Sequence, residues 1–261
     1  MNSIQHRLIR YLPATVRHGL RAWNSVRQVR RFTAEGWAEA SVVQRLIRPG
    51  DAVVDAGANI GYISALLAKW VGPSGTVHSI EPIPETFQLL QRSIQSLGLR
   101  QVRLHDCGVS DEPGQAFMEV PTYPDGAENF YESHLVKAAA ASPQSRKFSV
   151  SLRTLDELVG DTLSRVTFAK IDVEGHEGPA LRGAARLLAA ARPALLVEID
   201  DRLDQPRPAT ASLLQQVTQL GYGVFVMEAD AVRPWRPGDK SVDYFFLTPE
   251  HLSSMLDAGS S

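Results

Sequence analysis

Strand and helix patterns alternate along most of this chain, and this alternation restricts the fold more than any other feature. From Ala38 onward, short apolar runs typical of buried strands are followed by runs whose apolar residues recur at helical spacing. Strands joined by helices pair in parallel, and the helices cover both faces of the sheet. The sequence therefore predicts an α/β fold with a doubly wound, mostly parallel sheet. The seven strands expected in this sheet span 52–56, 75–82, 101–109, 166–175, 193–200, 222–228 and 242–249.

The alternation is interrupted between about residues 114 and 153. Residues 115–120 and 147–152 have the pattern of two strands, and a polar stretch with Pro and Gly lies between them. We therefore expect an inserted β-hairpin. The loop from Pro121 to Lys147 is expected to be mobile, and its aromatic side chains either anchor it or form a wall of a substrate site. These side chains are Tyr123, Tyr131 and His134.

The first 36 residues are predicted to form a basic helical extension before one large domain, residues 37–261. Seven arginines precede the first acidic residue, Glu35, and apolar residues recur at helical spacing on both sides of Pro13. Two short amphipathic helices are therefore expected. Their apolar faces either cover the large domain and leave the arginines in solvent, which is our expectation, or contact an anionic membrane surface or substrate carrier. The apolar face of the second helix comprises Val16, Leu20 and Trp23.

Composition narrows the broad class of protein. A hydrophobic content of 44% is enough for a core, and a net charge of −2 gives no general electrostatic reason to expect nucleic acid as a partner. The single cysteine, Cys107, excludes a disulfide framework and a zinc site built from several cysteines. No apolar run is long enough to span a membrane, and no signal peptide is recognisable. We expect a cytoplasmic protein, located at the inner membrane surface if the basic extension binds lipid; the oligomeric state is not predicted.

The segment VVDAGANIGY, residues 53–62, places an acid and two glycines where a buried strand turns into a helix. Doubly wound sheets bind ligands beyond the carboxyl ends of their strands, where Gly57 and Gly61 would let backbone amides approach a ligand closely. Neither G-x-G-x-x-G nor G-x-x-x-x-G-K-[ST] is present, which disfavours a dinucleotide or a P-loop nucleotide. Asp55 would repel a pyrophosphate but suits a cation, and S-adenosylmethionine carries an ammonium, a carboxylate and no phosphate. We therefore predict an S-adenosylmethionine site that includes Asp55, Gly57, Asn59 and Gly61.

Two further acids end the next two predicted strands. Glu81 can accept hydrogen bonds from both ribose hydroxyls of the cofactor, and Asp106 can meet the adenine amino group. Each acid also has a structural explanation, as a helix cap for Asp55, a solvated strand end for Glu81 and a turn brace for Asp106. Three acids at three successive strand ends favour a shared cofactor site. We expect Asp55 and Glu81 to lie at its solvent-reachable rim.

The motifs VVDAGANIGYISALLA, HSIEP, TLDEL, FAKIDVEGHEGPALRGA and RPALLVEI, in that order, resemble those of the FkbM-type methyltransferases. The resemblance covers roughly residues 39–249, and KIDVEGHE is its most specific part, although His176 stands where the family commonly has a small residue. The resemblance implies a Rossmann-like class I methyltransferase fold and S-adenosylmethionine as the methyl donor. It also implies O-methylation of a hydroxyl on a saccharide, a glycolipid or a glycosylated natural product.

A hydroxyl acceptor must lose a proton as it is methylated, so a general base is expected near the cofactor. Asp172, at the end of the fourth core strand, is the leading candidate for the base or for a residue that positions the acceptor. His176 is the second candidate, because histidine ordinarily titrates near neutral pH. Glu177 is a further catalytic candidate, although acids such as Glu174 and Glu177 at a helix start can also simply stabilise the helix. Lys170 is expected to neutralise a buried acid.

Other assignments stay open at this point. Glu198 and the same acids could hold a divalent cation, but no ligand spacing is diagnostic and metal-free catalysis is preferred. The chain could instead be a non-catalytic S-adenosylmethionine-binding scaffold, which the intact KIDVEGHE segment argues against. A dinucleotide-dependent oxidoreductase is disfavoured by the glycine spacing. The expected partner is a small-molecule or glycan acceptor, whose identity the sequence does not define.

Overall fold

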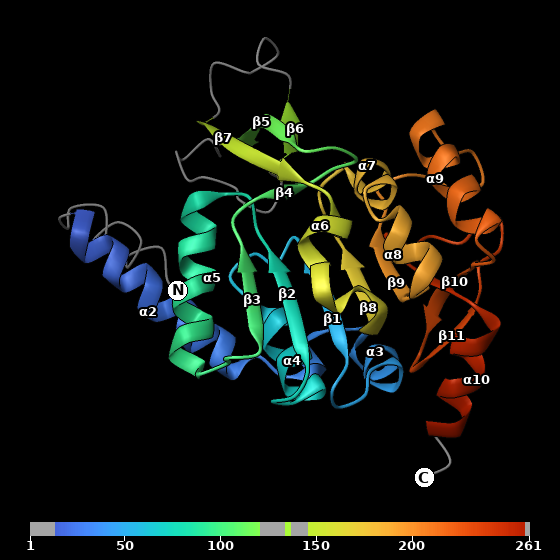
Figure 1. Cartoon of the computed structure of the whole chain (residues 1–261), viewed down its shortest axis with the longest axis horizontal. Coiled ribbons are helices and arrows are strands. Elements are labelled where there is room, and N and C mark those ends of the chain that lie inside the picture. Colours follow the sequence, from blue (N-terminus) through green and yellow to red (C-terminus); the bar gives the residue numbers. More distant parts are fainter. Residues whose placement is uncertain (1–13, 121–133, 137–145, 259–261) are drawn as a thin grey trace.

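A computed structural model describes residues 14–120, 134–136 and 146–258 (Figure 1). Within these residues one large sheet crosses the molecule, and helices cover both of its faces. Its strands are β1 (Ala52–Ala56), β2 (Thr76–Ile80), β3 (Val102–His105), β8 (Val166–Ile171), β9 (Ala194–Glu198), β10 (Gly223–Glu228), β11 (Ala231–Pro234) and β12 (Asp243–Leu247). They lie in the order β11-β10-β12-β9-β8-β1-β2-β3.

The predicted doubly wound, mostly parallel sheet is confirmed. Strands β3, β2, β1, β8 and β9 pair in parallel, whereas β12 is antiparallel to both of its neighbours, β9 and β10. The expected number of seven strands is wrong, because β11 forms a hairpin with β10 and adds an eighth strand at the edge. This strand has only four residues and ends in Pro234, so it is too short to show an alternating pattern.

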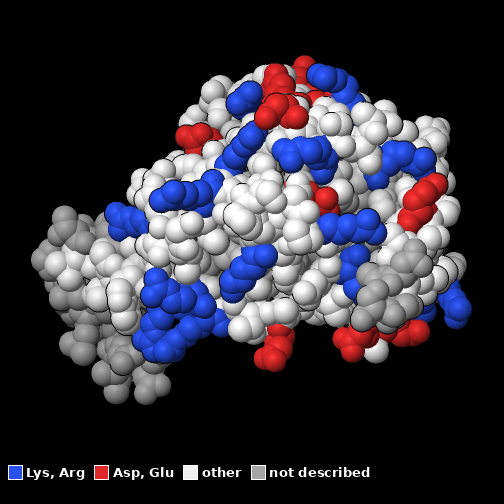
Figure 2. All heavy atoms as spheres, turned by 60° about the horizontal axis from the view of Figure 1, so that its bottom comes forward, with Lys and Arg blue, Asp and Glu red and all other residues white. Residues whose placement is uncertain are grey.

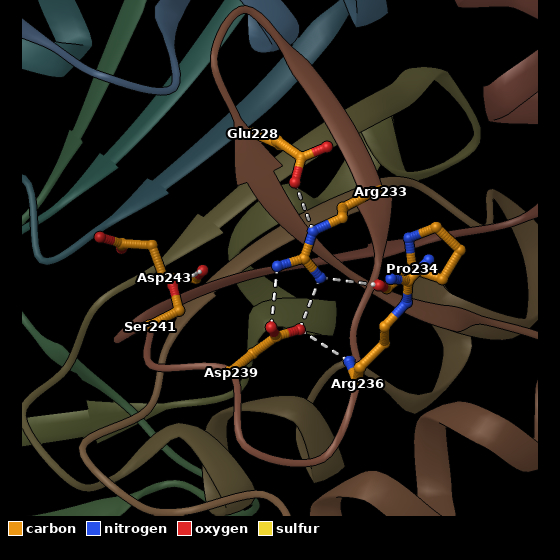
Figure 3. A network of polar contacts seen from close by, with 7 residues as sticks. All are labelled: Glu228, Arg233, Pro234, Arg236, Asp239, Ser241 and Asp243. Atoms are coloured by element: carbon orange, nitrogen blue, oxygen red, sulfur yellow. Dashed lines mark hydrogen bonds and ion pairs between the residues drawn. The ribbon is translucent and has the colours of Figure 1, made fainter.

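Arg233 holds the β10–β11 hairpin and the turn that follows it (Figure 3). Its Nε donates to Glu228 Oε1 at 2.9 Å, and its two terminal nitrogens donate to the two carboxylate oxygens of Asp239 at 2.6 and 2.8 Å. Asp239 also accepts a hydrogen bond from the backbone N–H of Arg236 at 2.7 Å. This bidentate pair holds the chain segment that leads into β12. The first residue of β12, Asp243, lines the cavity described below.

Alternate residues of the central strands belong to cores on opposite faces of the sheet. Val54 packs with α6 (Leu155–Val159), α7 (Glu177–Arg182), α8 (Ala185–Ala190) and α9 (Pro208–Gln219). Val53 packs with α3 (Ala40–Leu46), α4 (Tyr62–Val71) and α10 (Pro249–Ala258). At the β3 edge, α5 (Pro84–Leu97) packs through Leu90 and Ile94. Two 3₁₀ segments, η1 (Ala34–Gly36) and η3 (Gly160–Arg165), connect these elements.

A second, smaller sheet lies beside the carboxyl edge of the large one (Figure 1). It contains β4 (Gly108–Val109), β5 (Gly114–Val120), β6 (His134–Val136) and β7 (Arg146–Arg153), in the order β4-β7-β5-β6. The predicted hairpin is confirmed as the antiparallel pair β5 and β7. The single strand expected over 101–109 is wrong, because the chain leaves the large sheet after His105 and enters the small one at Gly108. The expected loop lies mostly outside the described residues, including Tyr123 and Tyr131; His134 is part of β6.

The N-terminal extension contains α2 (Ala14–Arg31), which packs against α5. The first of the two expected helices lies outside the described residues. The expectation that Val16, Leu20 and Trp23 cover the large domain is wrong, because all three are exposed. Small side chains on the other side of the helix make the contact instead, and they permit a closer approach. No helix within the described ranges is long and apolar enough to cross a membrane.

Candidate cofactor and catalytic site

A cavity of about 310 Å³ lies at the carboxyl edge of the parallel strands. Doubly wound sheets bind ligands at this edge, and the volume falls within the range of small-molecule sites. The segments after β1, β2 and β8 contribute to its lining, as do Glu198 at the end of β9 and Asp243 at the start of β12. Val109 and Met118 come from the small sheet. The fold therefore brings together at one place several segments that are distant in the sequence.

The turn after β1 comes so close to the turn after β8 that only glycine fits at position 57. A Cβ on Gly57 would lie 1.9 Å from the backbone oxygen of Asp172, and its φ of +84° is also one that favours glycine. Gly61 precedes α4 with a φ of +100°, and a Cβ there would lie 2.8 Å from Leu90 Cδ1. Gly57 and Asn59 line the cavity, whereas Gly61 lies outside the lining and lets α4 begin.

Glu81 follows β2 and lines the cavity although the residue is only 5% exposed. Its Oε2 accepts a hydrogen bond from the backbone N–H of Asn59, and its Oε1 accepts one from that of Ile83, both at 3.0 Å. Burial raises the pKa of Glu81 to about 7, and the two backbone hydrogen bonds only partly oppose this shift. Each carboxylate oxygen has a further lone pair, so Glu81 can still accept hydrogen bonds from a ligand.

Asp55 does not lie at the rim where we expected it. The residue is 1% exposed and lies outside the cavity lining, and its Oδ2 accepts a 2.6 Å hydrogen bond from Ser64 Oγ. Its Oδ1 is buried without a hydrogen-bond partner in the described part of the chain. Burial raises the pKa of Asp55, while the nearby Lys170 lowers it. The physical reason for the correction is that β1 continues to Ala56, so Asp55 is still inside a strand that is covered on both faces.

Asp106 is not brought to the cavity either. The side chain is exposed, because β3 ends at His105 and the chain then turns towards the small sheet. Three later residues, Cys107, Gly108 and Val109, line the cavity in its place. The predicted contact between Asp106 and adenine is therefore not supported by its position.

Lys170 and Asp172 form an ion pair in the cavity, with Lys170 Nζ 2.6 Å from Asp172 Oδ2. Only 11% of the lysine side chain is exposed, against 26% of the aspartate side chain. Burial alone would lower the pKa of Lys170, but the carboxylates of Asp172 and Asp55 outweigh burial and raise it. The prediction that Lys170 neutralises a buried acid is confirmed.

Three more acids adjoin this ion pair: Glu198, Glu39 and Asp243, and no sequence motif indicates the last two. Asp243 pairs with Glu198 in the antiparallel register of β12 and β9, and Glu39 precedes α3. Burial and then Asp172 raise the pKa of Glu198 strongly, and the Glu198 carboxyl hydrogen-bonds to Asp172. Burial also raises the pKa values of Glu39 and Asp243. Within the described ranges, no group of three or more His, Cys, Asp or Glu side chains is arranged to hold a metal ion.

The segment after β8 places its candidate residues in different surroundings. His176 lines the cavity with its Nε2 3.0 Å from Ser110 Oγ, and burial lowers its pKa. Glu174 also lines the cavity. Glu177 lies outside the lining and is 8% exposed. Its Oε1 accepts hydrogen bonds from the backbone N–H groups of Val173 and Gly175 at 3.3 and 3.0 Å, so the carboxylate braces the turn and is not brought to the cavity.

The lining is rich in acids, and this charge indicates the kind of ligand. Among the described residues, the lining contains one lysine, Lys170, and six side chains with carboxyl groups: Glu39, Glu81, Asp172, Glu174, Glu198 and Asp243. Their oxygens can accept hydrogen bonds from an ammonium or a hydroxyl, although the raised pKa of about 8 keeps Glu198 protonated at neutral pH. S-adenosylmethionine is a sulfonium and an ammonium, and its ribose hydroxyls match the acceptor oxygens of Glu81, so the residues present fit this group. Fold and site together define a doubly wound protein that binds a small cationic cofactor.

Comparisons with known proteins give the family. Residues 55–224 match the family described as Methyltransferase FkbM domain. Methyltransferase 1 of Beauveria bassiana is 29% identical over 145 residues, which are 50% of this chain and 57% of that protein. The 31-O-demethyl-FK506 methyltransferase FkbM of Streptomyces tacrolimicus is 42% identical over 79 residues, 30% of this chain and 29% of that protein. The crystal structure of methyltransferase FkbM from Methylobacillus flagellatus is 17% identical with a TM-score of 0.48, over 90% of this chain and 60% of that one.

The chain belongs to the FkbM methyltransferase family, because the family match covers well over half of its length. The family's description as a methyltransferase domain agrees with the S-adenosylmethionine site expected from the sequence. The resemblance seen in the sequence is therefore confirmed. The matches span 57% and 29% of the lengths of the two curated relatives, so those relatives' own substrates say nothing directly about this chain.

Cofactor affinity should depend on pH through Glu81. Ribose hydroxyls donate hydrogen bonds to an ionised carboxylate. The cofactor should therefore bind most tightly above the Glu81 pKa of about 7 and more weakly as the pH falls below it. We expect the dissociation constant of S-adenosylhomocysteine to rise about tenfold per pH unit below that value, because one proton must then be displaced. Calorimetric titration measures this constant. Glu81→Gln should bind more weakly at neutral pH with a flatter pH profile, and a flat profile in the unaltered protein would contradict the assignment.

Proposed function

We propose that the chain is an O-methyltransferase that transfers the methyl group of S-adenosylmethionine to a hydroxyl of a saccharide, a glycolipid or a glycosylated natural product. The observation that carries this proposal is the place of Asp172. Its backbone oxygen lies against the glycine turn that forms the cofactor floor, and its side chain lines the same cavity. A base at this position is within reach of both the donor and the acceptor.

Asp172 has the surroundings that a general base requires. S-adenosylmethionine held by these residues would supply an activated methyl group, and its sulfur would keep the electron pair of the broken carbon–sulfur bond when the carbon–oxygen bond forms. The acceptor proton passes to Asp172. Lys170 Nζ lies 2.6 Å from Asp172 Oδ2 and holds the carboxylate in place. Glu198 holds its own proton more firmly because of its raised pKa, and its hydrogen bond to Asp172 orients the carboxylate.

His176 is the second candidate for the proton acceptor. Burial lowers its pKa, so the imidazole is neutral at neutral pH and can accept a proton. The hydrogen bond between Nε2 and Ser110 Oγ fixes the ring orientation.

Cofactor binding is proposed for the turn residues Gly57 and Asn59 and for Glu81. The hydrogen bond from the Asn59 backbone N–H to Glu81 links the ends of β1 and β2. Asp55 acts beneath them through Ser64 and the charge of Lys170, as a positioning residue.

A saccharide-like acceptor is supported by the other side chains of the cavity. Trp37 and Tyr62 line the cavity and can contact the apolar side of a sugar ring, while the carboxyl groups accept hydroxyl hydrogen bonds. One relative is named 31-O-demethyl-FK506 methyltransferase FkbM, a name that places its methyl group on an oxygen. We propose that this chain acts on a related class of hydroxyl compound in the cytoplasm.

The test is a screen of glycans, glycolipids and glycosylated natural products with isotopically labelled methyl donor. The expected result is labelled product with the methyl group on oxygen, shown by NMR of the purified compound. Tight binding of S-adenosylmethionine without transfer to any acceptor would favour the scaffold alternative. A methyl group on nitrogen would overturn the proposed acceptor class while leaving the cofactor site intact.

A further inference from the structure

Helix α2 turns its apolar side towards solvent. Val16, Leu20 and Trp23 are 44%, 42% and 61% exposed, although they are the large apolar residues between Ala14 and Trp23. Together with Arg27 they follow one another at intervals of four, three and four residues, so they form a single stripe along the helix. Exposed apolar side chains gathered in this way mark an interaction surface more often than scattered ones do.

The opposite side of the helix attaches it to the domain. Ala22, Ser25 and Val29 are buried there at intervals of three and four residues. Ser25 Oγ lies 3.3 Å from Ser93 Oγ on α5, and the Arg30 side chain donates a 3.4 Å hydrogen bond to the backbone oxygen of Ser96. The stripe therefore points away from the protein because the helix is held in this orientation.

Positive charge surrounds the stripe. Arg21, Arg27 and Arg31 are exposed, and the Arg27 guanidinium lies 5.4 Å from the centre of the Trp23 ring. The sequence has no Asp or Glu before Glu35. Figure 2 shows Lys and Arg side chains gathered on the left of the molecule, the side on which Figure 1 places α2, with no acidic side chain among them. The surface thus combines an apolar stripe with exposed arginine charge.

We propose that helix α2 docks the protein onto an anionic lipid bilayer. The stripe would enter the boundary between headgroups and acyl chains while the arginines meet lipid phosphates, as interfacial amphipathic helices do. Nucleic acid would satisfy the arginines but offers no apolar partner for Val16 and Leu20. A second copy of the helix would cover the stripe but would bring like charges together. The anionic bilayer is the occupant that satisfies both features.

Docking through α2 would hold the cavity near the membrane. Tyr62, which lines the cavity, donates a 2.8 Å hydrogen bond to Gln28 Oε1 on α2, and its ring centre lies 4.9 Å from that of Phe32. The proposal does not rest on the acceptor assignment, because membrane binding can be measured without turnover.

Vesicle flotation with the full-length protein tests the proposal. We expect the protein to float with phosphatidylcholine vesicles that contain phosphatidylglycerol, to remain in solution with phosphatidylcholine alone, and to lose binding at high salt. Leu20→Ser with Trp23→Ala should weaken binding about tenfold or more, and so should Arg21→Gln with Arg27→Gln. Because these side chains are exposed, all variants should keep the melting temperature of the unaltered protein.

Matched controls lie elsewhere on the surface. Leu256→Ser removes a side chain that is 75% exposed on α10, and Arg186→Gln removes an exposed cation on α8; both variants should bind vesicles normally. Equal flotation with both kinds of vesicle, or unchanged flotation of the two α2 variants, would overturn the proposal. The proposal would also be overturned if the protein did not bind vesicles but self-associated through Trp23. Binding to single-stranded oligonucleotides and not to vesicles would overturn it as well.

Discussion

Replacing Asp172 with asparagine should lower the turnover number by about a hundred- to ten-thousandfold, the usual contribution of a general base. Asparagine keeps the shape of the side chain but cannot take the acceptor proton. The affinity for S-adenosylhomocysteine should change much less, because the Glu81 contacts proposed for the ribose are untouched. Single-turnover rates, measured with an acceptor found in the screen, and calorimetric titration of the same preparation separate the two effects.

The ion pair with Lys170 requires a matched control. Losing the Asp172 charge leaves a buried ammonium with less compensation, so Asp172→Asn should also lower the melting temperature. In the double variant Lys170→Met with Asp172→Asn both charges are absent, and stability should partly return. If Asp172 takes the proton, turnover stays low in the double variant; recovered turnover would show that Asp172 only braces Lys170. A stable single variant with a near-normal rate would exclude both roles.

The large sheet was predictable because its central strands are buried on both faces. Strands β1 (AVVDA) and β8 (VTFAKI) therefore appear in the sequence as mostly apolar runs with turn residues after them, whereas β2 (TVHSI) carries three polar residues and is marked by its place between two helices. The short strands β4 and β11, with two and four residues, carry too few positions to show any periodicity. They form because a longer neighbouring strand offers a free edge, which is a property of the assembled sheet and not of the local sequence.

The residues of the site that come from a single sequence segment were predictable, whereas the residues that strand pairing brings together were not. Asp172 and Lys170 belong to one motif, and their contact follows from alternation at the end of a strand. Asp243 reaches the cavity only through its register opposite Glu198, which no local pattern reveals. The predicted strand over 52–56 has the same bounds as β1, so the error for Asp55 concerns its side chain: the residue lies inside a strand that is covered on both faces and not at the ligand rim.

The orientation of α2 illustrates a different limit of sequence patterns. Helical spacing identifies an apolar stripe but not the surface that the stripe contacts. Here the small side chains of Ala22 and Ser25 allow close packing on α5, and the large residues are left outside. A helix with two usable sides can therefore attach through the less hydrophobic one when that side has the better fit.

Replacing Gly57 with alanine should lower the free energy of unfolding by about 3 kcal/mol or more. A strained backbone costs of order 1–3 kcal/mol, and forcing an extra atom into a packed region costs about 1–3 kcal/mol in addition. Both apply here, because φ is +84° and the new Cβ would lie 1.9 Å from the backbone oxygen of Asp172. Thermal unfolding followed by circular dichroism, with and without S-adenosylhomocysteine, measures the loss.

Gly98→Ala is the matched control for this last change. Gly98 also has a positive φ, +68°, but no atom lies within 4 Å of the Cβ that alanine would add, so only the backbone strain of about 1–2 kcal/mol should appear. In Gly57→Ala the turn and Asp172 must move apart, and a displacement of about 1 Å at a site of this kind can cost a hundredfold in rate. Folded Gly57→Ala should therefore bind S-adenosylhomocysteine weakly and transfer methyl groups slowly, whereas Gly98→Ala keeps both properties. Equal losses of stability and normal cofactor affinity in both variants would show that the approach of the two turns is not what shapes the site.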